Sequence, residues 1–166
     1  MEKRRKISKN KCLILLSVAI GIMAIILVTI ISNQNKTFSC TQTSDQPNLG
    51  YKTETTIKIF YNDNQTKRVK STKNIETNNK EKLDELVDNY TSQYDLNNTN
   101  YGGYSKTSSK TDDMHATFIG EIDYEKVDMQ KFIEDNPAIK QYTDNGKLTK
   151  DGAKRMYEAS GFICKE

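Results

Sequence analysis

An uninterrupted apolar stretch dominates the pattern of hydrophobic and polar positions. Residues 12–31, CLILLSVAIGIMAIILVTII, contain no charge and only two hydroxyl side chains, Ser17 and Thr29. Twenty helical residues extend about 30 Å, which matches the hydrocarbon core of a bilayer. The stretch therefore predicts a transmembrane helix, to which we assign residues 12–32.

The residues before this stretch predict its orientation. Residues 1–11 hold six Lys or Arg and one Glu, and a short basic segment beside a transmembrane helix stays in the cytoplasm. We therefore expect a cytoplasmic tail (1–11), a single-pass helix (12–32), a tether (33–39) and an extracytoplasmic domain (40–166). A cleaved secretory signal is the alternative, although the apolar run is long for one and no Ala-x-Ala site follows it. Both interpretations place the domain outside the cell membrane.

Alternation of polar and apolar positions predicts strands in the first part of the domain. A strand is expected at 38–43, followed by a clearer one at 51–61, and 66–75 returns as a more polar strand that we interpret as a sheet edge. The face of 51–61 expected to be buried consists of Tyr51, Thr53, Thr55, Ile57, Ile59 and Tyr61.

Spacings of three and four then predict a helix over 79–94, with Leu83, Leu86 and Val87 on its apolar stripe. A second hairpin follows, with strands at 101–109 and 115–124. A short helix is expected within 125–135, and a final helix begins after Thr149, with Gly161 just past its end.

The order of elements is therefore β-β-β-α-β-β-α-α. Hairpins with short connections give antiparallel pairs, and amphipathic helices need a sheet face to cover. The pattern predicts an α+β domain in which one antiparallel sheet carries helices on one face.

Charge differs between the tail and the rest of the chain. The total of 25 Lys and Arg against 22 Asp and Glu becomes 19 against 21 when the tail is removed, a net charge of −2. The outer part therefore lacks the basic field that binds phosphates, and nucleic acid is not an expected partner.

Cysteine positions suggest a covalent link. Cys40 and Cys164 lie near the two ends of the outer domain, whereas Cys12 lies at the cytoplasmic end of the apolar stretch. In an extracytoplasmic domain this arrangement predicts a Cys40–Cys164 disulfide. Chain-entropy arguments give such a long loop about 4 to 5 kcal/mol of stabilisation. Two separate buried thiols are the alternative.

The residues that could carry chemistry favour structural interpretations. His115 is the single histidine and falls on the polar face of its strand, without an identifiable nucleophile. One histidine also argues against most zinc sites. The acidic group Glu121, Asp123, Glu125 and Asp128 could bind a hard cation weakly, but alternating charge on an exposed strand is more common.

Two further patterns are also interpreted structurally. Residues 144–148, DNGKL, resemble part of a calcium loop, but Gln141 and Gly152 stand where its first and last carboxylates belong, so a turn is expected. Nine tyrosines and no tryptophan could form a carbohydrate-binding face, but most fall on core faces of the predicted elements. No catalytic residue, cofactor or metal ligand is therefore assigned.

Three short patterns resemble a known group of proteins. They are Ser39-Cys40-Thr41, residues 122–128 (IDYEKVD) and residues 161–164 (GFIC). They are similar to the YehR-like small envelope lipoproteins of low-GC Gram-positive bacteria, a domain without assigned function, over residues 38–164. The resemblance implies no catalytic residues. This chain departs from the group by lacking a lipidated cysteine, and the apolar helix takes the place of that anchor.

Together these features predict a non-enzymatic binding or interaction module of the bacterial cell envelope. Its expected partners are the membrane, in which it is integral, and an unidentified envelope component or membrane protein. A structural or signalling partner of another membrane protein is the alternative, and an envelope hydrolase is a third interpretation.

Overall fold

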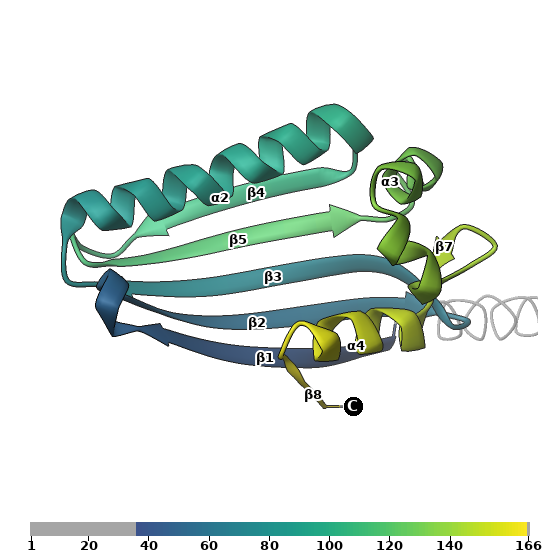
Figure 1. Ribbon diagram of the computed structural model, residues 1–166, viewed down its shortest axis with the longest axis horizontal. Coiled ribbons are helices and arrows are strands. Elements are labelled where there is room, and N and C mark those ends of the chain that lie inside the picture. Colours follow the sequence, from purple (N-terminus) through teal and green to yellow (C-terminus); the bar gives the residue numbers. More distant parts are fainter. Residues whose placement is uncertain (1–35, 166) are drawn as a thin grey trace, which may run out of the picture. The chain divides into compact units, whose positions relative to one another are not determined.

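A six-stranded antiparallel sheet forms the centre of the domain in the computed structural model, which describes residues 36–165 (Figure 1). The strands lie in the spatial order β4-β5-β3-β2-β1-β8. The expected helix at 12–32 and the tail at 1–11 lie outside the described residues. Within residues 36–165, no helix is both long and apolar enough to cross a membrane.

The chain enters the sheet through a meander of three long strands. These are β1 (Lys36–Gln46), β2 (Tyr51–Asn62) and β3 (Gln65–Thr77), with the short helix η1 (Pro47–Leu49) between the first two. The second hairpin follows the longest helix, α2, and adds β5 beside β3. Its elements are α2 (Lys80–Tyr101), β4 (Tyr104–Lys110) and β5 (His115–Asp123).

The remaining elements lie over or beside this sheet. They are α3 (Met129–Asp135), η2 (Pro137–Tyr142), the hairpin β6 (Thr143–Asp144) and β7 (Lys147–Leu148), α4 (Lys150–Ala159) and β8 (Ile163–Lys165). The helices cover one face of the sheet, and Figure 1 shows α4 lying across β1 and β2 on that face. The α+β fold class with helices on one face is thus confirmed.

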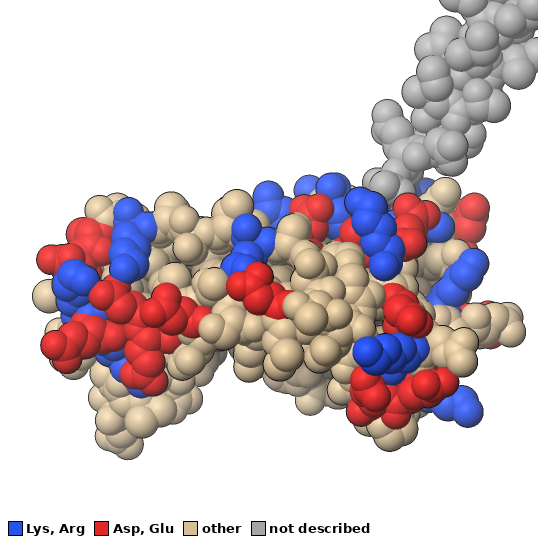
Figure 2. Space-filling view, turned by 90° about the horizontal axis from the view of Figure 1, so that it is seen from above, with Lys and Arg blue, Asp and Glu red and all other residues tan. Residues whose placement is uncertain are grey.

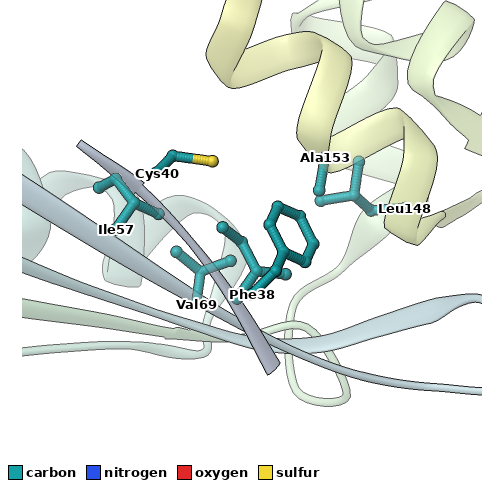
Figure 3. Close-up of a cluster of buried hydrophobic side chains, with 7 residues drawn as sticks. Phe38, Cys40, Ile57, Val69, Leu148 and Ala153 are labelled. Carbon is teal, nitrogen blue, oxygen red and sulfur yellow. The ribbon is translucent and has the colours of Figure 1, made fainter. Parts of the chain in front are cut away.

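Two hydrophobic clusters lie side by side between the helices and the sheet. One joins β1, β2 and β3 to β7 and α4, and Figure 3 shows Phe38, Ile57 and Val69 of the sheet facing Leu148 and Ala153. The other cluster packs α2 against β3 and β5. It consists of Ile75, Leu83, Leu86, Val87, Ala116 and Phe118. The period-two and helical patterns therefore identified the core faces correctly.

Helix α2 begins as its sequence predicts and continues further than expected. The Asn79 side chain caps it by accepting hydrogen bonds from the N–H groups of Glu81 and Lys82, at 2.7 and 3.3 Å. The helix runs on to Tyr101, seven residues beyond its expected end at Tyr94. In this added part Asp95 forms an ion pair with Lys106 of β4.

Two expectations about the strands are corrected. Residues 36–39, assigned to the tether although a strand was also expected from residue 38, belong to β1, because they pair with β2 and because Phe38 is buried. The strand expected at the sheet edge, β3, lies between β2 and β5. Its lysines suit the interior of this sheet because the uncovered face leaves Lys70 in contact with water, while Lys73 lies over the Tyr90 ring, 4.1 Å from its centroid.

The C-terminal strand β8 was not predicted. It pairs with β1, and Cys164 lies directly opposite Cys40 in that pairing. The expected Cys40–Cys164 disulfide is present, and it joins residues 124 positions apart in the sequence. The expected order of elements therefore lacks both β8 and the small β6–β7 hairpin.

Candidate binding groove

A groove of about 990 Å³ lies at the end of the domain where β3 begins. Five separate segments line it: the start of β3, the chain that leaves β5, helix α3, η2 and the β6–β7 hairpin. This volume falls at the upper end of the range for small-molecule sites. We refer to it below as the binding groove.

Local hydrogen bonds position α3 along one wall. Asp128 caps the helix, since its carboxylate accepts a hydrogen bond from the N–H of Lys131 at 3.1 Å. The N–H of Asp128 in turn donates to the carbonyl of Tyr101 at 2.8 Å, which ties the helix to the end of α2. This places Met129 and Ile133 toward the groove.

The opposite wall is a hairpin fixed by its turn. Asn145 and Gly146 both have positive φ, at 48° and 75°, as the tightest hairpin turns require. Leu148, only 2% exposed, holds the second strand of the hairpin in the core. Thr149 then caps α4 by accepting a hydrogen bond from the N–H of Gly152 at 2.9 Å, as the sequence predicted.

The groove combines an apolar floor with a charged rim. The floor is formed by Tyr124, Val127, Met129, Ile133 and Leu148. The rim carries three lysines and three carboxylates, so that its charges balance. They are Lys67, Lys140, Lys147, Glu125, Glu134 and Asp144.

Two features of the rim and the floor, an ion pair and a raised pKa, affect the chemistry of the groove. Lys67 and Glu125 form an ion pair with 3.1 Å between Nζ and Oε1. Burial raises the pKa of Tyr124 well above its usual value of 10, so that its phenol stays protonated even in alkaline solution. The groove therefore presents an uncharged floor, to which Tyr124 contributes the aromatic ring, beneath partly paired charges.

The sequence-predicted candidates lie apart from the floor of this groove. His115 lies on the uncovered face of the sheet, where its Nδ1 is 2.8 Å from a carboxylate oxygen of Asp112. Hydrogen bonds from the N–H of Met114 and from the His115 ring lower the pKa of Asp112. Both residues line a smaller recess of about 390 Å³. The polar, solvent-facing position expected for His115 agrees with the structure.

Each of the four acidic candidates has its own partner, and that of Asp128 is the N–H of Lys131 at the start of α3. Glu121 pairs with Arg68 at 3.5 Å, and Glu125 pairs with Lys67. Asp123 pairs with Lys126 at 2.8 Å, and this hydrogen bond lowers the pKa of Asp123. Among residues 36–165, no group of three or more His, Cys, Asp or Glu side chains is arranged to hold a metal ion.

Sequence reasoning missed the groove as a unit, although it identified several of its parts. Residues 144–148 were expected to form a turn, and they do so as the β6–β7 hairpin. The tyrosines, in contrast, are half-buried, and most of them pack against the two hydrophobic clusters. Tyr90 and Tyr94 contact the Phe118 ring, at centroid distances of 5.6 and 5.4 Å, rather than forming an exposed aromatic face.

The sequence of residues 31–166 matches a family described as Domain of unknown function (DUF8824). The chain belongs to this family. No curated protein matches the DUF8824 chain in sequence.

Two solved structures share the fold of the DUF8824 domain. The NMR structure of the YehR protein of E. coli is 20% identical with a TM-score of 0.52, and the match covers 78% of this chain and 91% of YehR. An NMR structure of a protein from Streptococcus pneumoniae TIGR4 is 13% identical with a TM-score of 0.51, covering 80% and 86% of the two chains. At these identities the likeness concerns the fold alone. The expected resemblance to YehR-like domains is confirmed at that level.

Proposed function

We propose that this DUF8824 chain is a non-enzymatic binding module, anchored in the cell membrane by residues 12–32, with its domain on the extracytoplasmic side. The apolar run and the basic residues before it support the anchor and its orientation. The Cys40–Cys164 bond supports an oxidising location, because such bonds persist mainly outside the cytosol.

The observation that carries the binding role is the groove itself. An apolar floor beneath a rim of balanced charge favours a ligand that is amphipathic and neutral on balance. Figure 2 shows charges of both signs on the visible face, with Asp and Glu gathered toward one end of it. The partner is an envelope component that inserts an apolar part between α3 and the β6–β7 hairpin.

The chemistry of the groove favours binding over catalysis. No histidine or cysteine stands among its described lining residues, and Lys67 is paired with Glu125. The hydroxyls of Thr66 and Thr143 donate to backbone carbonyls, so neither is paired with a carboxylate that could act as its base. The groove therefore acts by offering an apolar and charged surface to a bound ligand.

Photocrosslinking in intact cells tests this proposal. A benzophenone amino acid at Gln130, on the α3 wall, should capture an envelope component, whereas the same group at Lys82, on α2, should not. Adding Ile133→Glu should remove the Gln130 adduct, because a carboxylate on the floor opposes an apolar ligand. Equal capture from both positions, or none from Gln130, would contradict the groove as the site. Capture of an integral membrane protein would favour the structural or signalling alternative.

A separate experiment tests the anchor. A tag placed after residue 166 should react with membrane-impermeant reagents on whole cells, and the chain should stay in the membrane fraction after an alkaline carbonate wash. Reaction only after lysis would reverse the proposed orientation.

A further inference from the structure

The face of the sheet opposite the helices carries a central row of uncharged side chains. Strand pairing places one residue from each of the six strands directly beside the next, and alternation directs them all to this face. The row consists of Ile163, Thr41, Thr56, Thr72, Ile119 and Thr107. All six side chains are β-branched and short, and each exposes at least one methyl group on this face.

Charges of opposite sign lie on the two sides of this row. On the side of the β2–β3 turn, the same face has a net charge of +2. Its charged residues are Lys58, Arg68, Lys70, Lys165, Glu121 and Asp123. On the other side the net charge is −2, with histidine neutral. Its charged residues are Asp45, Glu54, Glu76 and Lys52.

This distribution is self-complementary about a two-fold axis along the central row. On β2, Lys58 and Glu54 lie equally far from Thr56 on opposite sides of the row. The two-fold axis therefore brings Lys58 of one copy opposite Glu54 of the other copy, and Glu54 of the first opposite Lys58 of the second. On β3, Arg68 and Glu76 are related in the same way about Thr72. An isologous contact needs such pairs, in which each surface meets its own copy.

One of these cationic groups is held in place within the domain. The guanidinium of Arg68 lies over the Phe60 ring, 4.1 Å from its centroid, and also pairs with Glu121. Positioning a long side chain in advance reduces the entropy lost when it forms a contact. Lys58 also lies over the Phe60 ring, at 5.4 Å.

The area of the face suits a dimer. Strands spaced about 4.8 Å apart and residues rising about 3.3 Å each make β1 to β5 roughly 24 Å by 27 Å over the charged and uncharged rows. This is on the order of 650 Å² before side-chain relief, close to the roughly 800 Å² per partner of a standard interface. Sheets stacked face to face pack about 10 Å apart.

We propose that the uncovered face binds a second copy of this chain, with the central row of each copy along the two-fold axis. The binding groove and the helices stay outside this contact. The proposal therefore does not depend on the function proposed above.

Complementary charge reversal tests the contact in the full-length chain, purified in mild detergent. One variant carries Lys58→Glu and Arg68→Glu, and the other carries Glu54→Lys and Glu76→Lys. Each alone places like charges together and should weaken self-association at least about tenfold. An equimolar mixture should restore the dimer, because each reversed side chain then meets its opposite.

The control reverses a pair on the helical side, Lys82→Glu with Glu85→Lys, and should leave association unchanged. Sedimentation analysis with differently tagged chains distinguishes homodimers from mixed dimers. A monomeric wild-type chain, a reversed variant that associates like the wild type, or a mixture that stays monomeric would overturn the proposal.

A crosslinking experiment gives a second readout that needs no charge change. In a Cys12→Ser background, Thr72→Cys should form an intermolecular disulfide under mild oxidation, because Thr72 meets its own copy on the axis. Ser109→Cys, on the rim of the same face, should form it at least about tenfold more slowly. Equal rates at the two positions would contradict the proposed axis.

Discussion

Burial raises the pKa of four tyrosines. The pKa of Tyr104 rises to about 12, and those of Tyr94, Tyr124 and Tyr157 also rise. The unfolded chain releases these protons near pH 10, whereas the folded domain keeps them. Because the unfolded state then binds fewer protons, the free energy of unfolding falls as pH rises. This contribution is complete below pH 10 and is lost as the pH passes each folded-state pKa.

We therefore expect alkaline unfolding that begins near pH 10. Absorbance at 295 nm should show at least three of the nine tyrosines ionising together with unfolding. In Tyr104→Phe, the free energy of unfolding should fall less steeply above pH 10. The decrease in slope should correspond to at most one proton fewer released on unfolding. An unchanged dependence in this variant would show that Tyr104 ionises equally in the folded and unfolded states.

The first turn of α4 requires glycine at position 152, where a side chain would not fit. A Cβ atom at Gly152 would lie 1.9 Å from the carbonyl oxygen of Tyr142, a backbone atom that cannot rotate away. Gly152→Ala should therefore lower the free energy of unfolding by about 1 to 3 kcal/mol, as overpacking does. Glu158→Ala, on the exposed side of the same helix, should change it by less than about 0.5 kcal/mol. Urea titration followed by circular dichroism measures both.

Helix α2 contributes stability through a few positions. Leu83 is fully buried against the sheet, whereas Leu96 of the same helix is 60% exposed. Leu83→Ala should cost about 2 to 5 kcal/mol. Leu96→Ala should cost less than about 0.5 kcal/mol. The two substitutions change helix propensity equally, so similar losses in thermal unfolding would contradict the packing described for α2.

Elements with a strong local pattern were predictable, and those that depend on distant pairing were not. The buried face of β2 follows from a period of two in its sequence. Asn79 and Thr149 are residue types that favour the N-cap position, and they mark the starts of α2 and α4. β8 has three residues and exists because β1 lies beside it. The central position of β3 likewise depends on β5, which is more than thirty residues away.

The groove could not be predicted for the same reason. Its walls come from the start of β3, from α3 and from a hairpin near residue 145, which only the complete fold brings together. Local signals existed for single walls only. They were the short helix expected within 125–135 and the dipeptide Asn145-Gly146, which favours tight hairpin turns. A turn signal gives no information about the surface that the turn faces.

At the scale of the whole molecule, one covalent bond encloses nearly the entire domain. The Cys40–Cys164 bond closes a loop across 124 positions. Replacing both cysteines with serine should lower the free energy of unfolding by about 2 to 5 kcal/mol. Cys12→Ser, which leaves the bond intact, is the matched control. Equal stability of the two variants would show that pairing of β1 with β8 is sufficient without the bond.

The same bond determines how the domain responds to tension between its two ends. A pull applied at residue 36 and residue 165 travels from β1 directly through the two sulfur atoms into β8, since Cys40 and Cys164 are direct neighbours in the sheet. The sheet and helices enclosed between them carry none of that load. The domain should therefore extend under force by only the few residues outside the bond, and should lengthen fully only after a reductant is added.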